Sequence, residues 1–185
     1  MYIAQQLKEK NIAEYLLYLW QVEDLIRAAH WDMDVLRKEV VSKFQPTPEQ
    51  EVELLQWYES LIEMMREENV LQSGHLQMSK NVIIRLMDLH IALLKSPKYP
   101  FYSGAYYKAL PFIVELRAKN NGKEEPELET CFEALYGVML LRLQKKEVRT
   151  ETLRAVEAIS SLLSMLANYY IKERDGEIQL NSETD

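Results

Sequence analysis

Apolar residues return at helical spacing along most of the chain, and the most apolar stretch of helix length is Asn11–His30, NIAEYLLYLWQVEDLIRAAH. Apolar side chains lie on nearly every side of this stretch when it is placed on a helical wheel. Asn11 is followed three residues later by Glu14, which resembles the capping box that opens many helices. We therefore predict a central helix that ends near Ala29 and contacts at least three other helices.

The rest of the pattern predicts further helices and no strands, because runs of β-branched residues with alternating polarity are absent. A short lead-in over residues 1–10 precedes the central helix. Six more helices are expected, and the first three cover about residues 32–43, 47–70 and 75–95. The fourth begins near residue 103 and is kinked or split at Pro111. After a linker at 119–127, the fifth covers about residues 126–146, and the sixth runs from a cap at Thr150 to a point before Gly176. The chain is thus expected to be all-α: one domain of about seven mostly antiparallel helices over residues 1–176, with a disordered tail at 177–185.

Two charged residues lie on the predicted core face of the central helix. With Glu14 set to zero on the wheel, Glu23 falls at about 180° and Arg27 at about 140°, among the apolar residues. A buried charge without a partner costs several kcal/mol, so we predict that these two residues, four positions apart, pair with each other. The pair is either a self-contained structural ion pair or part of a polar pocket that binds a small ligand.

Two further candidates come from the second half of the chain. His90 falls in the apolar stripe of its helix, so it is either a core histidine with a satisfied ring or an acid–base group in a pocket. The segment Tyr99–Phe112 is rich in aromatic residues, and we predict that Tyr102 and Tyr106 line an interface or the mouth of a pocket. The alternative is that these rings fasten a loop to the core.

The charge balance excludes two classes of partner. The formal net charge is −7, from 29 acidic and 22 basic residues, and no basic cluster stands out. Binding to nucleic acid or to an anionic membrane surface depends on clustered Lys and Arg, so neither partner is expected. The only cysteine, Cys131, excludes an internal disulfide and fits a reducing compartment. With no secretory signal pattern and no long uncharged apolar run, we predict a cytoplasmic protein.

Motifs for known chemistry are missing from the sequence. There is no zinc-binding HExxH pattern, no glycine-rich phosphate loop and no nucleophile elbow. His75 and His90 would lie roughly 22 Å apart along one helix, which argues against a shared metal ion. We therefore expect no cofactor and no metal.

Two functional hypotheses follow from these observations. The first is a non-enzymatic interaction or scaffold protein that self-associates as a homodimer or binds a protein partner, because aromatic surfaces are present and catalytic motifs are not. The alternative is a small-ligand-binding or enzymatic pocket built around Glu23, Arg27 and His90.

Two stretches carry a resemblance to a known family. The segment NIAEYLLYLWQVEDLIRA and the sequence GHLQ at 74–77 resemble a domain-of-unknown-function family of small helical proteins from Bacteroidetes. The resemblance implies a helical protein of the cytoplasm. It implies no activity and no functional residue.

Overall fold

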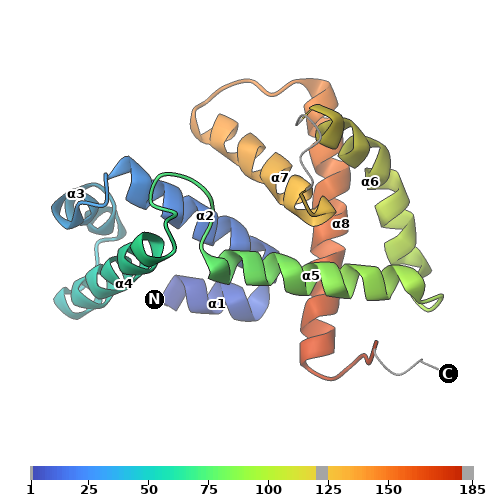
Figure 1. Ribbon diagram of the computed structural model, residues 1–185, viewed down its shortest axis with the longest axis horizontal. Helices are drawn as coiled ribbons and strands as arrows, with labels where there is room; N and C mark the ends of the chain where they lie inside the picture. The colour runs from blue at the N-terminus through green and yellow to red at the C-terminus, as the bar shows by residue number, and fades with distance from the viewer. Residues whose placement is uncertain (1, 120–124, 181–185) are drawn as a thin grey trace. The chain divides into compact units, whose positions relative to one another are not determined.

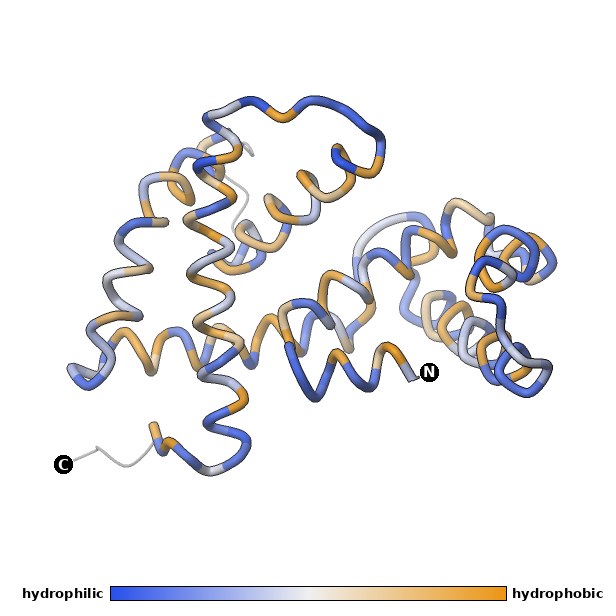
Figure 2. The backbone as a smooth tube through the Cα atoms, turned by 180° about the vertical axis from the view of Figure 1, so that it is seen from behind, coloured by the Kyte–Doolittle hydropathy of each residue, from blue (hydrophilic) through white to orange (hydrophobic). Residues whose placement is uncertain are grey.

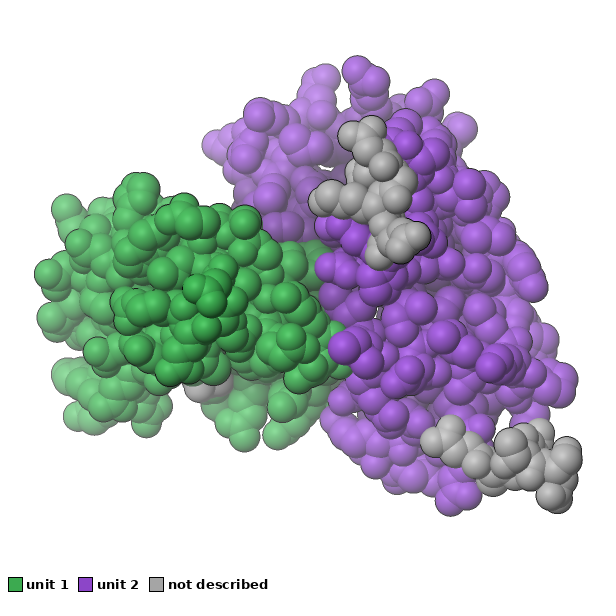
Figure 3. Space-filling model, viewed as in Figure 1, with its two compact units in different colours: residues 1–82 green, residues 83–185 purple. Residues whose placement is uncertain are grey.

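A computed structural model describes residues 2–119 and 125–180, and all regular structure in those residues is helical (Figure 1). The all-α prediction is confirmed. The described residues form eight α-helices and one short 3-10 helix, because the lead-in to the central segment is a helix of its own. The chain divides into two compact units, residues 1–82 and residues 83–185 (Figure 3). The predicted single domain over residues 1–176 stays a prediction, and each unit is described by itself below.

Unit 1 contains the predicted central helix together with its neighbours. Its elements are α1 (Tyr2–Lys10), α2 (Ile12–Ala28), α3 (Met33–Glu39), η1 (Val41–Phe44), α4 (Pro48–Glu67) and the start of α5 (Gln77–Lys95). Local sequence sets the helix starts. The Asn11 side chain accepts from the backbone N–H groups of Ala13 and Glu14, and Thr47 and Gln50 form a complete capping box.

The core of unit 1 is built on α2, in which nine residues are buried. Helix α2 packs against α1 and against α4. A hydrogen bond from Ser79 to Glu23 joins α2 to α5, so the predicted contact with three helices is confirmed. Hydrophobic residues return turn after turn along the helices (Figure 2), which is the periodicity that the sequence shows.

Unit 2 contains most of α5 and the helices α6 (Pro100–Lys119), α7 (Glu127–Leu143) and α8 (Thr150–Arg174). Helix α8 packs against α6 and α7, and α6 also packs against α7. The centre of this unit contains the buried side chains of Tyr102, Ile113, Phe132 and Leu163. No helix in the described residues is long and apolar enough to cross a membrane.

Three boundary predictions for unit 2 need correction. Helix α6 begins at Pro100, not Ser103, because proline is well suited to the first position of a helix. Of the predicted kink or split at Pro111, the split is wrong: α6 continues through Pro111, because Tyr107 and Pro111 both lie on its exposed side, where water can solvate the Tyr107 carbonyl that loses its partner. Thr150 does not cap α8: Arg149 occupies the cap position without a side-chain hydrogen bond.

The predicted linker and tail lie partly outside the described residues. Of the linker 119–127, residues 120–124 are not described, and of the tail 177–185, residues 181–185 are not described. Pro126 directly precedes α7, as the linker pattern predicts.

Candidate functional site

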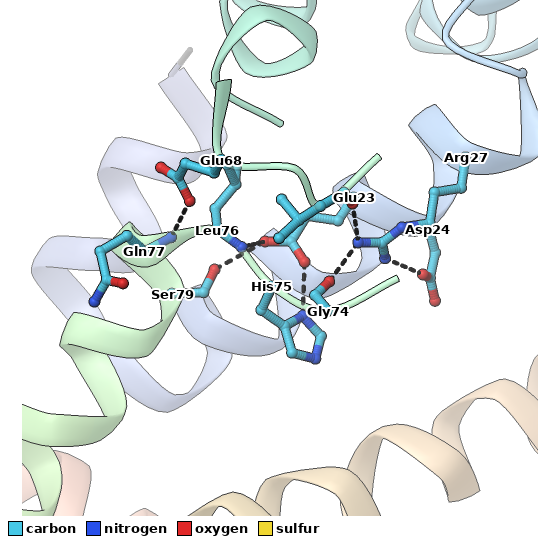
Figure 4. A network of polar contacts seen from close by, with 10 residues as sticks. Glu23, Asp24, Arg27, Glu68, Gly74, His75, Leu76, Gln77 and Ser79 are labelled. Atoms are coloured by element: carbon cyan, nitrogen blue, oxygen red, sulfur yellow. Dashed lines mark hydrogen bonds and ion pairs between the residues drawn. The ribbon is translucent and has the colours of Figure 1, made fainter. Parts of the chain in front are cut away.

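The polar site of unit 1 forms where the second half of α2 meets the segment 68–76 that leads into α5 (Figure 4). This segment is not helical, so its backbone N–H and C=O groups need partners from elsewhere. Gly74 adopts a φ of 85°, which glycine reaches without the steric cost of a side chain. The residues that hold this segment come from α2, some 50 positions earlier in the chain.

Glu23 is the centre of the site, and only 1% of its surface is exposed. Its Oε1 accepts hydrogen bonds from the Leu76 backbone N–H and the Ser79 hydroxyl, both at 3.1 Å. Its Oε2 lies 2.7 Å from Nδ1 of His75. Both carboxylate oxygens are therefore bonded inside the protein, which is what a buried acid requires.

His75 is held by two neighbours. Its ring stacks on Trp20, with centroids 4.3 Å apart and an angle of 14° between the planes. Glu23 binds Nδ1, and the other ring nitrogen points away from that carboxylate (Figure 4). A carboxylate that orients a histidine occurs in catalytic triads, but a triad also needs a nucleophile at the second nitrogen. Within the described residues the nearby Ser79 bonds to Glu23 instead, so the arrangement is suited to holding the chain in place.

Arg27 holds the same segment from the other side. Its guanidinium donates to the carbonyl oxygens of Val70, at 3.1 Å, and of Gly74, and it forms an ion pair with Asp24 at 2.9 Å. The predicted pairing of Glu23 with Arg27 is therefore wrong. The spacing on α2 allows it, but segment 68–76 brings polar groups that match each side chain separately.

Glu23 and Glu68 together supply the missing cap of α5. The first N–H groups of a helix have no partner within the helix. Here Glu23 accepts from the N–H of Leu76, and Glu68 accepts from the N–H of Gln77 at 2.6 Å. Negative charge at this end also interacts favourably with the helix dipole. The site is thus a tertiary cap, in which side chains from outside α5 bind its first N–H groups and fix where this helix begins.

Replacement of Arg27 by alanine is expected to release segment 68–76 and to lower the free energy of unfolding by about 1–3 kcal/mol, because charge-assisted bonds to two carbonyl groups are lost. Hydrogen exchange should accelerate at the amides of residues 70–76. Arg27→Lys should restore less than half of the loss, because one ammonium group cannot reproduce the planar fork.

Arg66→Ala is the matched control for this prediction, because Arg66 is exposed and pairs with Glu63 on its own helix. It should change stability by less than about 0.5 kcal/mol. Equal exchange rates at residues 70–76 in wild type and Arg27→Ala would show that Arg27 does not hold the segment.

The second polar cluster lies in unit 2 and contains the remaining candidates. His90 is 3% exposed, and its Nδ1 lies 2.5 Å from the hydroxyl of Tyr102, which is fully buried. Burial lowers the pKa of His90 to about 4 and raises the pKa of Tyr102 well above 10. The His90 ring also meets the ring of Tyr106 edge-on, with centroids 5.1 Å apart. This geometry matches a neutral core histidine whose polar atom has a partner.

Tyr106 connects this cluster to α7. Its hydroxyl lies 3.4 Å from Oε2 of Glu127, and its pKa is raised by burial and by that carboxylate. Burial likewise raises the pKa of the Cys131 thiol to about 12. A thiol in this state is protonated at neutral pH and has the character of a core residue.

The five sequence candidates thus fall into two groups: Glu23 and Arg27 in unit 1, and His90, Tyr102 and Tyr106 in unit 2. In the segment Tyr99–Phe112, Tyr102 is core, whereas Phe101 and Tyr107 are 83% and 66% exposed. A test of association must therefore change those two residues, because loss of Tyr102 would damage the core.

Sequence reasoning missed His75, Ser79 and Glu68 as partners of the α2–α5 junction. The position of His75 and Leu76 at the start of a predicted helix was the available signal, since helix starts need acceptors. Among residues 2–119 and 125–180, no group of three His, Cys, Asp or Glu side chains is arranged to hold a metal ion.

Comparison with known proteins identifies the family. A family model described as a domain of unknown function (DUF4924) matches residues 1–177, and the chain belongs to this family. The expected resemblance to such a family is confirmed, while its taxonomic part stays a prediction. No curated protein and no solved structure matches the chain. The two stretches that carried the resemblance meet in space at Glu23 and Arg27.

Proposed function

We propose that this protein acts in the cytoplasm as a non-enzymatic interaction protein and that it self-associates. The observation that carries the proposal is the outer face of α6, which we define as Phe101, Gly104, Tyr107, Pro111 and Val114. All five are exposed, and their spacing of three and four residues places them on one side of the helix. This side of a water-facing helix would ordinarily be polar.

The outer face of α6 is large enough to form an interface. A helix of 20 residues is about 30 Å long. Phe101, Tyr107 and Val114 are 83%, 66% and 59% exposed, and they occur along most of that length. Burying a side chain such as Phe101 or Val114 contributes about 1.5–3 kcal/mol, so a second copy that covers them gains a useful binding energy.

Gly104 supports close packing at the middle of this face. A Cβ atom added to Gly104 would meet no atom within 4 Å, so the space beside it is open. An open glycine between two exposed aromatic residues lets a partner backbone approach closely. Tyr and Phe are also enriched at protein interfaces.

The alternative function, a ligand or enzymatic pocket around Glu23, Arg27 and His90, has less support. The carboxylate of Glu23 already has three partners, and the ring nitrogen Nδ1 of His90 is bonded to Tyr102. A carboxylate and a ring nitrogen that already have partners inside the protein have less capacity left for a substrate.

Sedimentation velocity over a range of concentrations tests the proposal. Wild-type protein is expected to form dimers, and Phe101→Ser with Tyr107→Ser is expected to weaken the dimer at least about tenfold. Gly104→Glu should do the same, because the charge meets open space in the monomer but would be buried in the interface.

The control is Val52→Ser, which removes a 54% exposed apolar side chain from α4 in unit 1. It should leave association unchanged. A wild-type protein that remains monomeric at high concentration, or a dimer that tolerates Gly104→Glu, would contradict self-association through this face.

A further inference from the structure

A cleft of about 890 Å³ lies in unit 2 between α6, α7 and α8. Its floor is apolar and includes Phe112 and Leu116 from α6, Val138 and Leu141 from α7, and Val156 from α8. The cleft is separate from the outer face of α6 and shares no residue with it. Its volume falls in the range of about 300–1,000 Å³ that small-molecule sites occupy.

The sequence of α7 supports an occupied cleft. Between Ala134 and Leu141 this helix carries apolar residues on all sides, which is typical of a helix that is covered on all sides. Only Val138 of this stretch is buried, and Ala134, Leu140 and Leu141 line the cleft while half-buried. These residues would gain burial from a molecule that fills the cleft.

Among the described residues, two arginines that line the cleft have no ion-pair partner. Lys119 is paired with Glu115 at 2.6 Å, so this rim pair is neutral. Arg149 and Arg154 also line the cleft, and in the described residues neither guanidinium has a hydrogen bond or an ion pair. Glu133 and Glu151 are the other acids of the rim, and neither is joined to these arginines by an ion pair in that part of the chain.

We propose that the cleft binds a single-chain amphiphile with a carboxylate head, such as a long-chain fatty acid. The apolar floor takes the hydrocarbon chain, and Arg149 and Arg154 bind the carboxylate, for which the guanidinium fork is well matched. A protein helix fits less well. A helix with its side chains is about 10–12 Å wide, so the cleft holds less than about two turns of it.

The test measures binding of dodecanoate and of dodecanol to the full chain by isothermal titration calorimetry, below the concentration at which either aggregates. Wild-type protein is expected to bind dodecanoate at one saturable site. Arg149→Gln with Arg154→Gln should weaken dodecanoate binding by about tenfold or more and change dodecanol binding by less than about twofold, because only the head-group contacts are lost. Arg142→Gln, which removes the same charge from α7 outside the cleft lining, is the control.

Gly137 provides a second variant, and this variant is expected to stay folded. Gly137 lines the cleft, and an added Cβ atom would meet nothing within 4 Å, so Gly137→Leu is expected to place its side chain in the cleft. The substitution also removes a glycine from a helix interior, so the melting temperature should not fall. Gly137→Leu should weaken both ligands about tenfold or more. Val52→Leu, which enlarges an exposed apolar side chain on α4 in unit 1, should not.

Three results would overturn the proposal. These are the absence of saturable dodecanoate binding, binding that is unaffected by Gly137→Leu, and equal losses for dodecanoate and dodecanol in the double arginine variant. A protein complex that dissociates on Gly137→Leu while dodecanoate fails to bind would likewise assign the cleft to a protein partner instead.

Discussion

Replacement of Glu23 by alanine is expected to lower the free energy of unfolding of unit 1 by about 2–4 kcal/mol. The substitution removes the acceptor of the Leu76 N–H and of the Ser79 hydroxyl, and it removes the anchor of His75. Buried donors left without an acceptor are costly, and the start of α5 loses the part of its cap that Glu23 supplies. The measurement is urea unfolding followed by tryptophan fluorescence, because Trp20, Trp31 and Trp57 all lie in unit 1.

Two comparisons separate the role of the carboxylate from a general effect of substitution. Glu59→Ala removes an exposed carboxylate from α4 and should change stability by less than about 0.5 kcal/mol. Glu23→Gln keeps the shape and one acceptor oxygen, so it should recover about half of the loss. If Glu23→Ala is no more destabilising than Glu59→Ala, the tertiary cap does not contribute to stability.

The second large effect is a loss of stability in acid caused by His90. Burial lowers the pKa of this residue from its ordinary 6.5 to about 4, so between these values the unfolded chain binds the proton and the folded chain does not. Its contribution to stability is therefore complete above pH 6.5 and is lost as the pH falls toward 4. A shift of this size corresponds to about 3 kcal/mol.

His90→Gln isolates this contribution, because glutamine can keep a hydrogen bond to Tyr102 but does not titrate. Urea unfolding followed by circular dichroism should be measured at a series of pH values for both proteins. The wild type should lose about 3 kcal/mol more than His90→Gln between pH 6.5 and 4. Parallel pH profiles for the two proteins would mean that His90 does not stay neutral in the fold.

The helices and most of their starting points follow from the sequence by itself. Periodicity of apolar residues defines α2 and α4, and the caps at Asn11 and Thr47 act on residues only two or three positions away. The same periodicity places Glu23 on the core face, where it is buried. These features are predictable because their causes lie within one or two turns of helix.

The tertiary structure alone decides which groups meet and which faces stay open. Glu23 bonds to residues 52 to 56 positions away, and no local pattern favours these partners over Arg27 on the next turn. Helix α6 has apolar side chains on both its buried and its exposed sides, so periodicity could not distinguish core Tyr102 from exposed Phe101. Contacts between distant segments depend on how whole helices pack, and that packing is fixed by the summed burial of many side chains together, not by any one stretch of sequence.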